Sequence, residues 1–249
     1  EGNEAIKVYG RGEMHIAVLI ETMRREGFEL QISQPEVIMN EIDGVKQEPI
    51  EMAVINVPDN MAGTVIEALS KRKGIMKNMQ AANGNTALEF EIPTRGLLGF
   101  RSHFLLMTRG EGTLYHAFDH FAPYMGPIHK RSVGSLISME GGTAMAYSLW
   151  KLQERGPLFI DPNTEVYEGM IIGEHNQGTD LAVNPVKNKK MSNVRASGSD
   201  EALSLTPITP MTLEKAIEYI GPDEFVEITP TRVRLRKKLL KDHQRKKGQ

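Results

Sequence analysis

Basic and small polar side chains gather in one stretch of the sequence, residues 175–199. The residues in it that we predict to contact RNA are Lys187, Asn188, Lys189, Lys190, Ser192, Asn193, Arg195 and Ser197. Lys and Arg neutralise phosphates, and Asn and Ser form hydrogen bonds with phosphate, sugar or base edges. The stretch contains no Phe, Tyr or Trp, so it is suited to following an RNA backbone rather than to stacking on bases. The alternative is a polar loop without a partner.

The charge of the chain is distributed unevenly. The net charge is −2, but residues 1–174 carry −7, residues 175–199 carry +3, residues 200–231 carry −6 and residues 232–249 carry +8. A basic segment and a basic tail on an acidic body are typical of proteins that bind an anionic polymer such as nucleic acid. The tail alone is equally typical of a solvated chain end.

Three histidines are the candidate metal ligands, at His103, His116 and His120. On a helix, two histidines four residues apart can share one zinc ion. The sequence around them alternates as a strand, however, and there residues four apart are separated by about 13 Å. We therefore predict no metal site, and a histidine-based metallo-enzyme is the less favoured alternative.

Motifs for other catalysis are missing from the sequence. It has neither the G-x-x-x-x-G-K-[ST] phosphate loop nor a G-x-S-x-G elbow, and with no cysteine it has no disulfide and no thiol chemistry. Gly10-Arg11-Gly12 is interpreted as a structural turn into a helix. We predict no catalytic residue and no cofactor in this chain. No apolar run approaches the roughly 20 residues of a membrane span, and we expect a cytoplasmic protein.

The elements that would carry these side chains are organised around residues 48–124. Strand patterns at 50–57, before and after Asn83-Gly84, and at 111–121 alternate with helical patterns after residue 60 and at 94–107. Asp59 or Asn60 is expected to cap the first helix and Thr94 the second. This β-α-β-β-α-β order predicts a ferredoxin-like split βαβ domain, with both helices on one face of an antiparallel sheet.

The flanking segments predict two further domains, which makes the chain α+β. Residues 1–46 resemble half of a second split βαβ domain, whose apolar helix needs a sheet that we expect to lie upstream of this chain. Residues 47–124 form the central domain. Residues 125–249 form a mostly β domain with one short helix, capped by Thr212, and they contain the basic loop 175–199.

Several runs of sequence resemble those of elongation factor G-like translational GTPases. Glu48-Pro49-Ile50, Lys-Arg-Lys-Gly at 71–74 and Phe-Asp-His-Phe at 118–121 resemble the fifth domain of that family, and Gly-Arg-Gly-Glu-Met-His at 10–15 resembles the end of its third domain. Two more runs resemble the TypA/BipA members: Thr-Arg-Gly-Leu-Leu-Gly-Phe-Arg at 94–101 and Arg-Ala-Ser-Gly-Ser-Asp-Glu at 195–201.

The resemblance implies a larger parent protein whose GTPase domain, with its GTP and Mg²⁺, is not in this chain. It also implies binding to the bacterial ribosome, with the 175–199 loop directed at large-subunit rRNA and the tRNA acceptor end. The implied role is large-subunit assembly and stress-adapted translation. We expect the chain itself to be a monomer that does not bind membranes. The alternative is a protein–protein interaction module that uses the exposed face of the N-terminal half domain.

Overall fold

The structure is a computed structural model that describes residues 5–128, 131–187 and 204–247. The chain folds as two compact units. One unit comprises residues 35–130, and the other combines residues 1–34 with residues 131–249. In the described parts of the chain, no helix is both long and apolar enough to cross a membrane.

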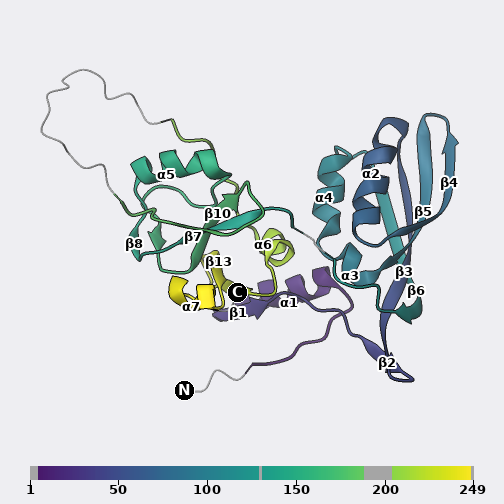
Figure 1. The fold of residues 1–249 in the computed structure, drawn as a ribbon, viewed down its shortest axis with the longest axis horizontal. Coiled ribbons are helices and arrows are strands. Elements are labelled where there is room, and N and C mark those ends of the chain that lie inside the picture. The colour runs from purple at the N-terminus through teal and green to yellow at the C-terminus, as the bar shows by residue number, and fades with distance from the viewer. Residues whose placement is uncertain (1–4, 129–130, 188–203, 248–249) are drawn as a thin grey trace, which may run out of the picture. The chain divides into compact units, whose positions relative to one another are not determined.

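The unit of residues 35–130 is an antiparallel sheet covered by helices (Figure 1). Its elements are β2 (Asn40–Ile42), β3 (Val45–Pro58), α2 (Asp59–Lys71), β4 (Ile75–Ala82), β5 (Asn85–Pro93), α3 (Thr94–Leu97), α4 (Phe100–Met107) and β6 (Thr113–Pro123). The strands lie in the order β6-β3-β5-β4, and β2 extends β3 as a hairpin. Since this is the strand order of a split βαβ domain, the predicted ferredoxin-like fold is confirmed.

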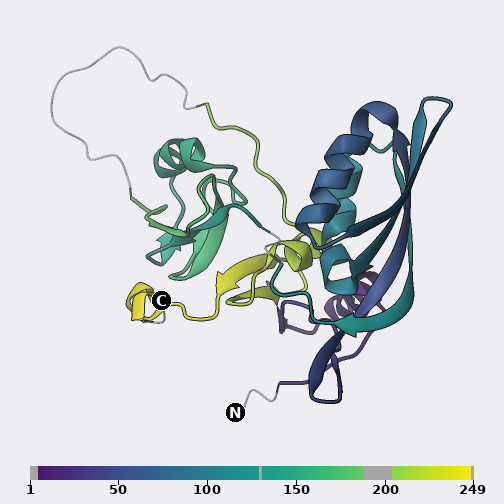
Figure 2. The same ribbon diagram turned by 45° about the vertical axis from the view of Figure 1, so that its right-hand side comes forward.

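One apolar core lies between this sheet and its helices. Alternate residues of β3 and β5 point into it, as the period of two along a strand requires. They meet Val65 and Leu69 of α2 and Phe100 and Phe104 of α4. Figure 2 shows the helices on one side of the curved sheet. At the hairpin between β4 and β5, Asn83 and Gly84 have φ angles of 54° and 79°, and a type I′ turn requires positive φ at both positions.

The predicted helix caps in this unit were wrong. No side-chain cap hydrogen bond is found at either helix start, because both side chains bond elsewhere. Asp59 accepts a hydrogen bond from Thr86 Oγ1 at 2.6 Å, and Thr94 donates to the carbonyl of Pro49 at 3.2 Å. The expected single helix 94–107 is also divided in two, because Gly99 between α3 and α4 has a φ of 68°.

The second unit is built on a six-stranded sheet. Its strands, in spatial order, are β1 (Leu30–Ser33), β12 (Glu224–Ile228), β13 (Val233–Lys237), β10 (Met170–His175), β7 (Gly134–Ser138) and β11 (Leu181–Val183). All neighbours are antiparallel except β7 and β11. The strands β8 (Gly142–Thr143) and β9 (Glu165–Val166) form a small separate ribbon.

The helices of this unit are α1 (Glu13–Arg25), α5 (Ala146–Leu152), α6 (Leu213–Tyr219) and α7 (Asp242–Lys247), with a short 3₁₀ turn η1 (Gln153–Arg155). The predicted cap of α6 is confirmed, since Thr212 Oγ1 accepts a hydrogen bond from the Lys215 backbone N–H at 3.3 Å. The largely β character of this part is confirmed too, although three short helices accompany the strands in residues 131–187 and 204–247, where one was predicted.

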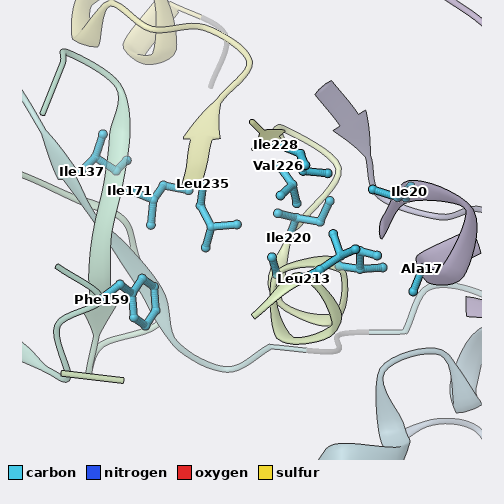
Figure 3. Close-up of a cluster of buried hydrophobic side chains, with 12 residues drawn as sticks. Ala17, Ile20, Ile137, Phe159, Ile171, Leu213, Ile220, Val226, Ile228 and Leu235 are labelled. Atoms are coloured by element: carbon cyan, nitrogen blue, oxygen red, sulfur yellow. The ribbon is translucent and has the colours of Figure 1, made fainter. Parts of the chain in front are cut away.

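One face of the N-terminal segment packs against residues of this chain. β1 pairs with the edge of β12, and Ala17 and Ile20 of α1 pack with Leu213 of α6 and Val226 of β12 (Figure 3). The sequence placed this helix in a domain completed from upstream. The contacts group residues 1–34 with residues 131–249 because a free strand edge and an apolar helix face both find partners there.

Candidate nucleic-acid interface

Lys187 is the one predicted RNA-contact residue that lies within the described part of the chain. It is exposed and follows β11 by four residues. The other seven predicted contacts lie outside the described residues: Asn188, Lys189, Lys190, Ser192, Asn193, Arg195 and Ser197. Their contribution to an interface stays a prediction, and the structure describes the two chain segments that lead into and out of residues 188–203.

The segment leading in is fixed by hydrogen bonds and by packing. The Asn184 side chain accepts from the Val186 backbone N–H at 3.0 Å, which closes a tight Asx turn. The Met145 backbone N–H donates to the Pro185 carbonyl at 2.9 Å, and Ser148 Oγ of α5 donates to the Lys187 carbonyl. Val186 packs against the apolar cluster that contains Leu136 and Leu149. The backbone of Lys187 is therefore held in place.

The segment leading out is fixed by the same helical region. Gln153 in η1 donates to the Ser204 carbonyl at 3.2 Å, and its side-chain oxygen accepts from the Thr206 backbone N–H at 2.9 Å. Leu205 and Ile208 pack against the same apolar cluster as Val186. Residues 148–153 thus bond both segments that flank residues 188–203, an arrangement that sequence patterns did not predict.

A buried network of ion pairs lies at the start of β11. Glu224, which is fully buried, accepts from Arg131 Nη2 at 3.0 Å and pairs with Lys237 Nζ at 2.8 Å. Lys237 Nζ also contacts Asp180 at 2.5 Å and Asp223 at 2.8 Å. Asp180 in turn accepts from the Ser135 backbone N–H at 2.8 Å, so the network joins the residue before β11 to three other strands.

Charges within the network set its pKa values. Burial by itself would raise the pKa of Glu224, but the positive charges of Arg131 and Lys237 and their hydrogen bonds outweigh it and lower this pKa. Burial would lower the pKa of Lys237, yet Glu224 and the hydrogen bonds to the three carboxylates raise it. Burial raises the pKa of Tyr219, which covers the Arg131 guanidinium, to about 12.

The alternation of residues along β13 is a signal of this network in the sequence. Val233, Leu235 and Lys237 share one face of β13, because they lie two residues apart, and the first two of them are apolar. Lys237 is therefore a charged residue at an inward position, and it is only 2% exposed. A lysine in such a place needs anionic partners, and Asp180, Asp223 and Glu224 supply them.

The three histidines considered as metal ligands each interact with a different residue. His116 Nδ1 pairs with Glu51, and this hydrogen bond raises the pKa of His116. Burial and the charge of Arg72 lower the pKa of His103. His120 pairs with the neighbouring Asp119. Within the described residues, no group of three His, Cys, Asp or Glu side chains could hold a metal ion.

Residues 94–101 make contacts that fix the chain between β5 and α4. Arg95 forms an ion pair with the fully buried Glu48 and donates to the Gly126 carbonyl at 2.5 Å. Arg72 donates to the carbonyls of Gly96 and Leu98 at 2.9 and 3.1 Å. A Cβ atom at Gly96 would lie 2.7 Å from the Arg72 carbonyl, so only glycine fits there. These contacts fix the connection between β5 and α4.

Comparison with known proteins agrees with the fold of each part. Residues 45–132 match the family described as Elongation factor G C-terminus, and residues 133–242 match the TypA/BipA C-terminal domain. Neither matched domain is a nucleotide-binding domain. The first match places the chain in the class of proteins related to elongation factor G. With the second, the chain belongs to the TypA/BipA family and corresponds to its C-terminal portion.

Curated relatives cover the whole of this chain. It is 50% identical over 250 residues to the large ribosomal subunit assembly factor BipA of Escherichia coli strain K12, an alignment that covers 100% of this chain and 41% of the relative. The proteins of the same name from Bacillus subtilis and Haemophilus influenzae are 47% and 50% identical over 247 residues, with 98% of this chain and 40% of each relative covered. The chain thus spans about two fifths of the length of these relatives.

Proposed function

We propose that this chain is the ribosome-binding portion of a TypA/BipA translational GTPase that acts in large ribosomal subunit assembly and stress-adapted translation. The relatives that share half of its residues are named as large-subunit assembly factors, which supports this role. The observation that carries the proposal is that residues 148–153 bond Lys187 and Ser204, the described residues on either side of the stretch that contains the other predicted contacts. Because both ends of that stretch are fixed on the protein, less entropy is lost when it binds rRNA or a tRNA acceptor end.

In this proposal the chain contributes recognition, and hydrolysis of GTP occurs elsewhere in a longer protein. Residues 1–46 would complete a third domain of the elongation factor G type with chain from upstream, and residues 47–124 would be its fifth domain. GTP and Mg²⁺ would bind a separate domain of that protein, in the cytoplasm. The predicted RNA contacts in this chain are the eight residues from Lys187 to Ser197 given above.

The test is co-sedimentation of the 249-residue chain with bacterial large ribosomal subunits. We expect Lys187→Ala, Lys189→Ala, Lys190→Ala and Arg195→Ala, combined in one variant, to lower the bound fraction at least tenfold, because four phosphate contacts would be lost. The unfolding midpoint is expected to change little, since exposed substitutions usually alter stability by less than about 0.5 kcal/mol. Undiminished binding by this variant would remove the segment from the proposal.

A second function, protein–protein contact through α1, is favoured by one observation. Met14 and Val18 on the outer face of this helix are 61% and 60% exposed, and they line a shallow cavity of about 280 Å³ together with Glu21 and Arg25. Such a surface would self-associate with little dependence on salt, whereas RNA binding weakens steeply as salt rises. Sedimentation velocity of the free chain across a salt series distinguishes the two functions.

A further inference from the structure

The outer face of α5 carries two aromatic rings and a cation. Tyr147 and Trp150 lie three residues apart on the helix, with ring centroids 6.3 Å apart and planes inclined by only 25°. The Lys151 ammonium lies 4.6 Å from the centre of the Tyr147 ring. This distance is short enough for a cation–π contact, which keeps the positive charge beside the rings.

Tyr147 and Trp150 are half-buried and Lys151 is exposed. Ser148 and Leu149 face inward and are 7% and 1% exposed, and Leu149 belongs to the apolar cluster of this unit. In the part of the chain that the structure describes, Tyr147 and Trp150 are not members of that cluster. Positions 147, 150 and 151 therefore form the opposite face of the helix, as the spacing of three and four residues requires.

The helix and the short turn that follows it contact both segments that flank residues 188–203. Ser148, next to Tyr147, donates to the carbonyl of the exposed Lys187, and Gln153, just beyond the helix, bonds Ser204 and Thr206. α5 is labelled in Figure 1. The aromatic face thus belongs to the helix that bonds the backbone of Lys187, although residues 175–199 contain no aromatic residue of their own.

We propose that Tyr147 and Trp150 form a stacking surface for an unpaired RNA base, with Lys151 and Lys187 neutralising the adjoining phosphates. Aromatic rings beside a positively charged groove are the usual device for holding single-stranded nucleic acid, because every base has a flat face that can stack. The inference rests on the proposed function, since it names the part of the RNA, an unpaired base, that this region recognises. In this proposal α5 binds RNA directly, in addition to its hydrogen bond with the backbone of Lys187.

The single tryptophan of the chain provides a direct test. The intact chain is titrated with a 12-nucleotide adenosine RNA and, separately, with polyphosphate of similar charge, which has no bases. We expect the RNA to quench Trp150 fluorescence to saturation and polyphosphate to leave it unchanged. RNA that binds, by anisotropy of a labelled strand, without quenching would overturn the inference while the proposed function stands.

Variants separate stacking from charge. We expect Trp150→Leu to weaken RNA binding about tenfold, within the range measured for loss of one stacked base, and to leave polyphosphate binding within about twofold. Trp150→Phe, which keeps a ring, is expected to retain most of the RNA affinity. Tyr115→Leu, at a 71% exposed tyrosine on β6 of the other unit, is the matched control and should change neither.

The outcomes also distinguish the inference from the proposed function. Equal weakening of RNA and polyphosphate binding by Trp150→Leu would overturn the stacking surface, since only bases can stack. Unchanged RNA affinity in that variant would do the same. If instead the four-alanine variant of the basic segment binds RNA as tightly as the unmodified chain, the proposed role of residues 187–195 fails, whatever the quenching of Trp150 shows.

Discussion

At the scale of single residues, the ion pairs around Glu224 show how this unit tolerates charge in its interior. Both carboxylate oxygens are used, by Arg131, by Lys237, by Ser135 Oγ at 3.0 Å and by the Gly221 backbone N–H at 2.8 Å. These buried charges stabilise the protein only together, because removal of one leaves the opposite charge buried and unpaired.

We predict that Glu224→Gln lowers the free energy of unfolding by about 3 kcal/mol at pH 7, the usual cost of breaking a buried ion pair. The lowered pKa of Glu224 fixes the sign of the pH dependence. Its contribution is present above the unfolded value of about 4.3 and is lost as the pH falls through the folded pKa. Urea unfolding of both proteins at pH 7 and pH 3.5 measures this, and the difference between them should shrink at the lower pH.

The control for this variant is Glu154→Gln at an exposed site of the same unit, which should change stability by less than about 0.5 kcal/mol. Equal stability of Glu224→Gln and the unmodified chain would show that the network contributes nothing net.

At the scale of elements, the division of the expected helix 94–107 into α3 and α4 depends on Gly99. Its φ of 68° and ψ of 14° are left-handed, a conformation that costs other residues about 1–2 kcal/mol. The turn lets Phe100 and Phe104 enter the core while Arg72 caps the carbonyls at the end of α3. A straight helix would keep one periodicity through residues 94–107 and could not make both sets of contacts.

We predict opposite effects for the same substitution at two glycines of this unit. Gly99→Ala should lower the free energy of unfolding by about 1 kcal/mol, because alanine is strained at positive φ. Gly63→Ala should raise it by about 0.5–1 kcal/mol, since Gly63 lies inside α2 and a Cβ atom there meets nothing within 4 Å. Thermal unfolding measures both. A neutral or stabilising Gly99→Ala would mean that the left-handed turn is not needed.

The sequence predicted an element correctly where contacts between residues close in the chain determine its structure. The Asn83-Gly84 hairpin, the Thr212 cap and the strand order of the ferredoxin-like unit follow from alternation and turn chemistry. The caps at Asp59 and Thr94 were wrong because Thr86 and Pro49, remote in sequence, take their hydrogen bonds. The pairing of β1 with β12 joins residues almost 200 positions apart, and no local pattern specifies it.

The candidate site, too, was predicted only in part. The eight RNA contacts were predicted from residue types alone, and of these residues the structure describes Lys187. The hydrogen bonds of Ser148 and Gln153 to the two segments that flank residues 188–203 join residues 39 and 51 positions apart. No local pattern in the sequence specifies contacts over such separations.

At the scale of the whole molecule, the basic tail supplies fewer free charges than its sequence suggests. Residues 232–249 carry +8, but Lys237 is buried among carboxylates, Arg236 pairs with Glu227 at 3.0 Å and Lys246 pairs with Asp242 at 2.6 Å. Cations already paired within the protein release fewer counterions when they approach phosphate. The segment at 187–195 should therefore account for more of the salt dependence of RNA binding than its share of the net charge.

The larger contribution of residues 187–195 can be measured with large ribosomal subunits. The quantity is the slope of the logarithm of the association constant against the logarithm of the salt concentration. Each phosphate contact contributes roughly −0.7 to −0.9 to the slope, so removing Lys187, Lys189, Lys190 and Arg195 should flatten it by about 3. Arg236→Gln with Lys246→Gln, which removes two paired cations, is the control and should change the slope by well under 1. If the control flattens the slope as much per residue as the segment variant, the paired tail residues contact the ribosome as well, and the segment has no privileged role.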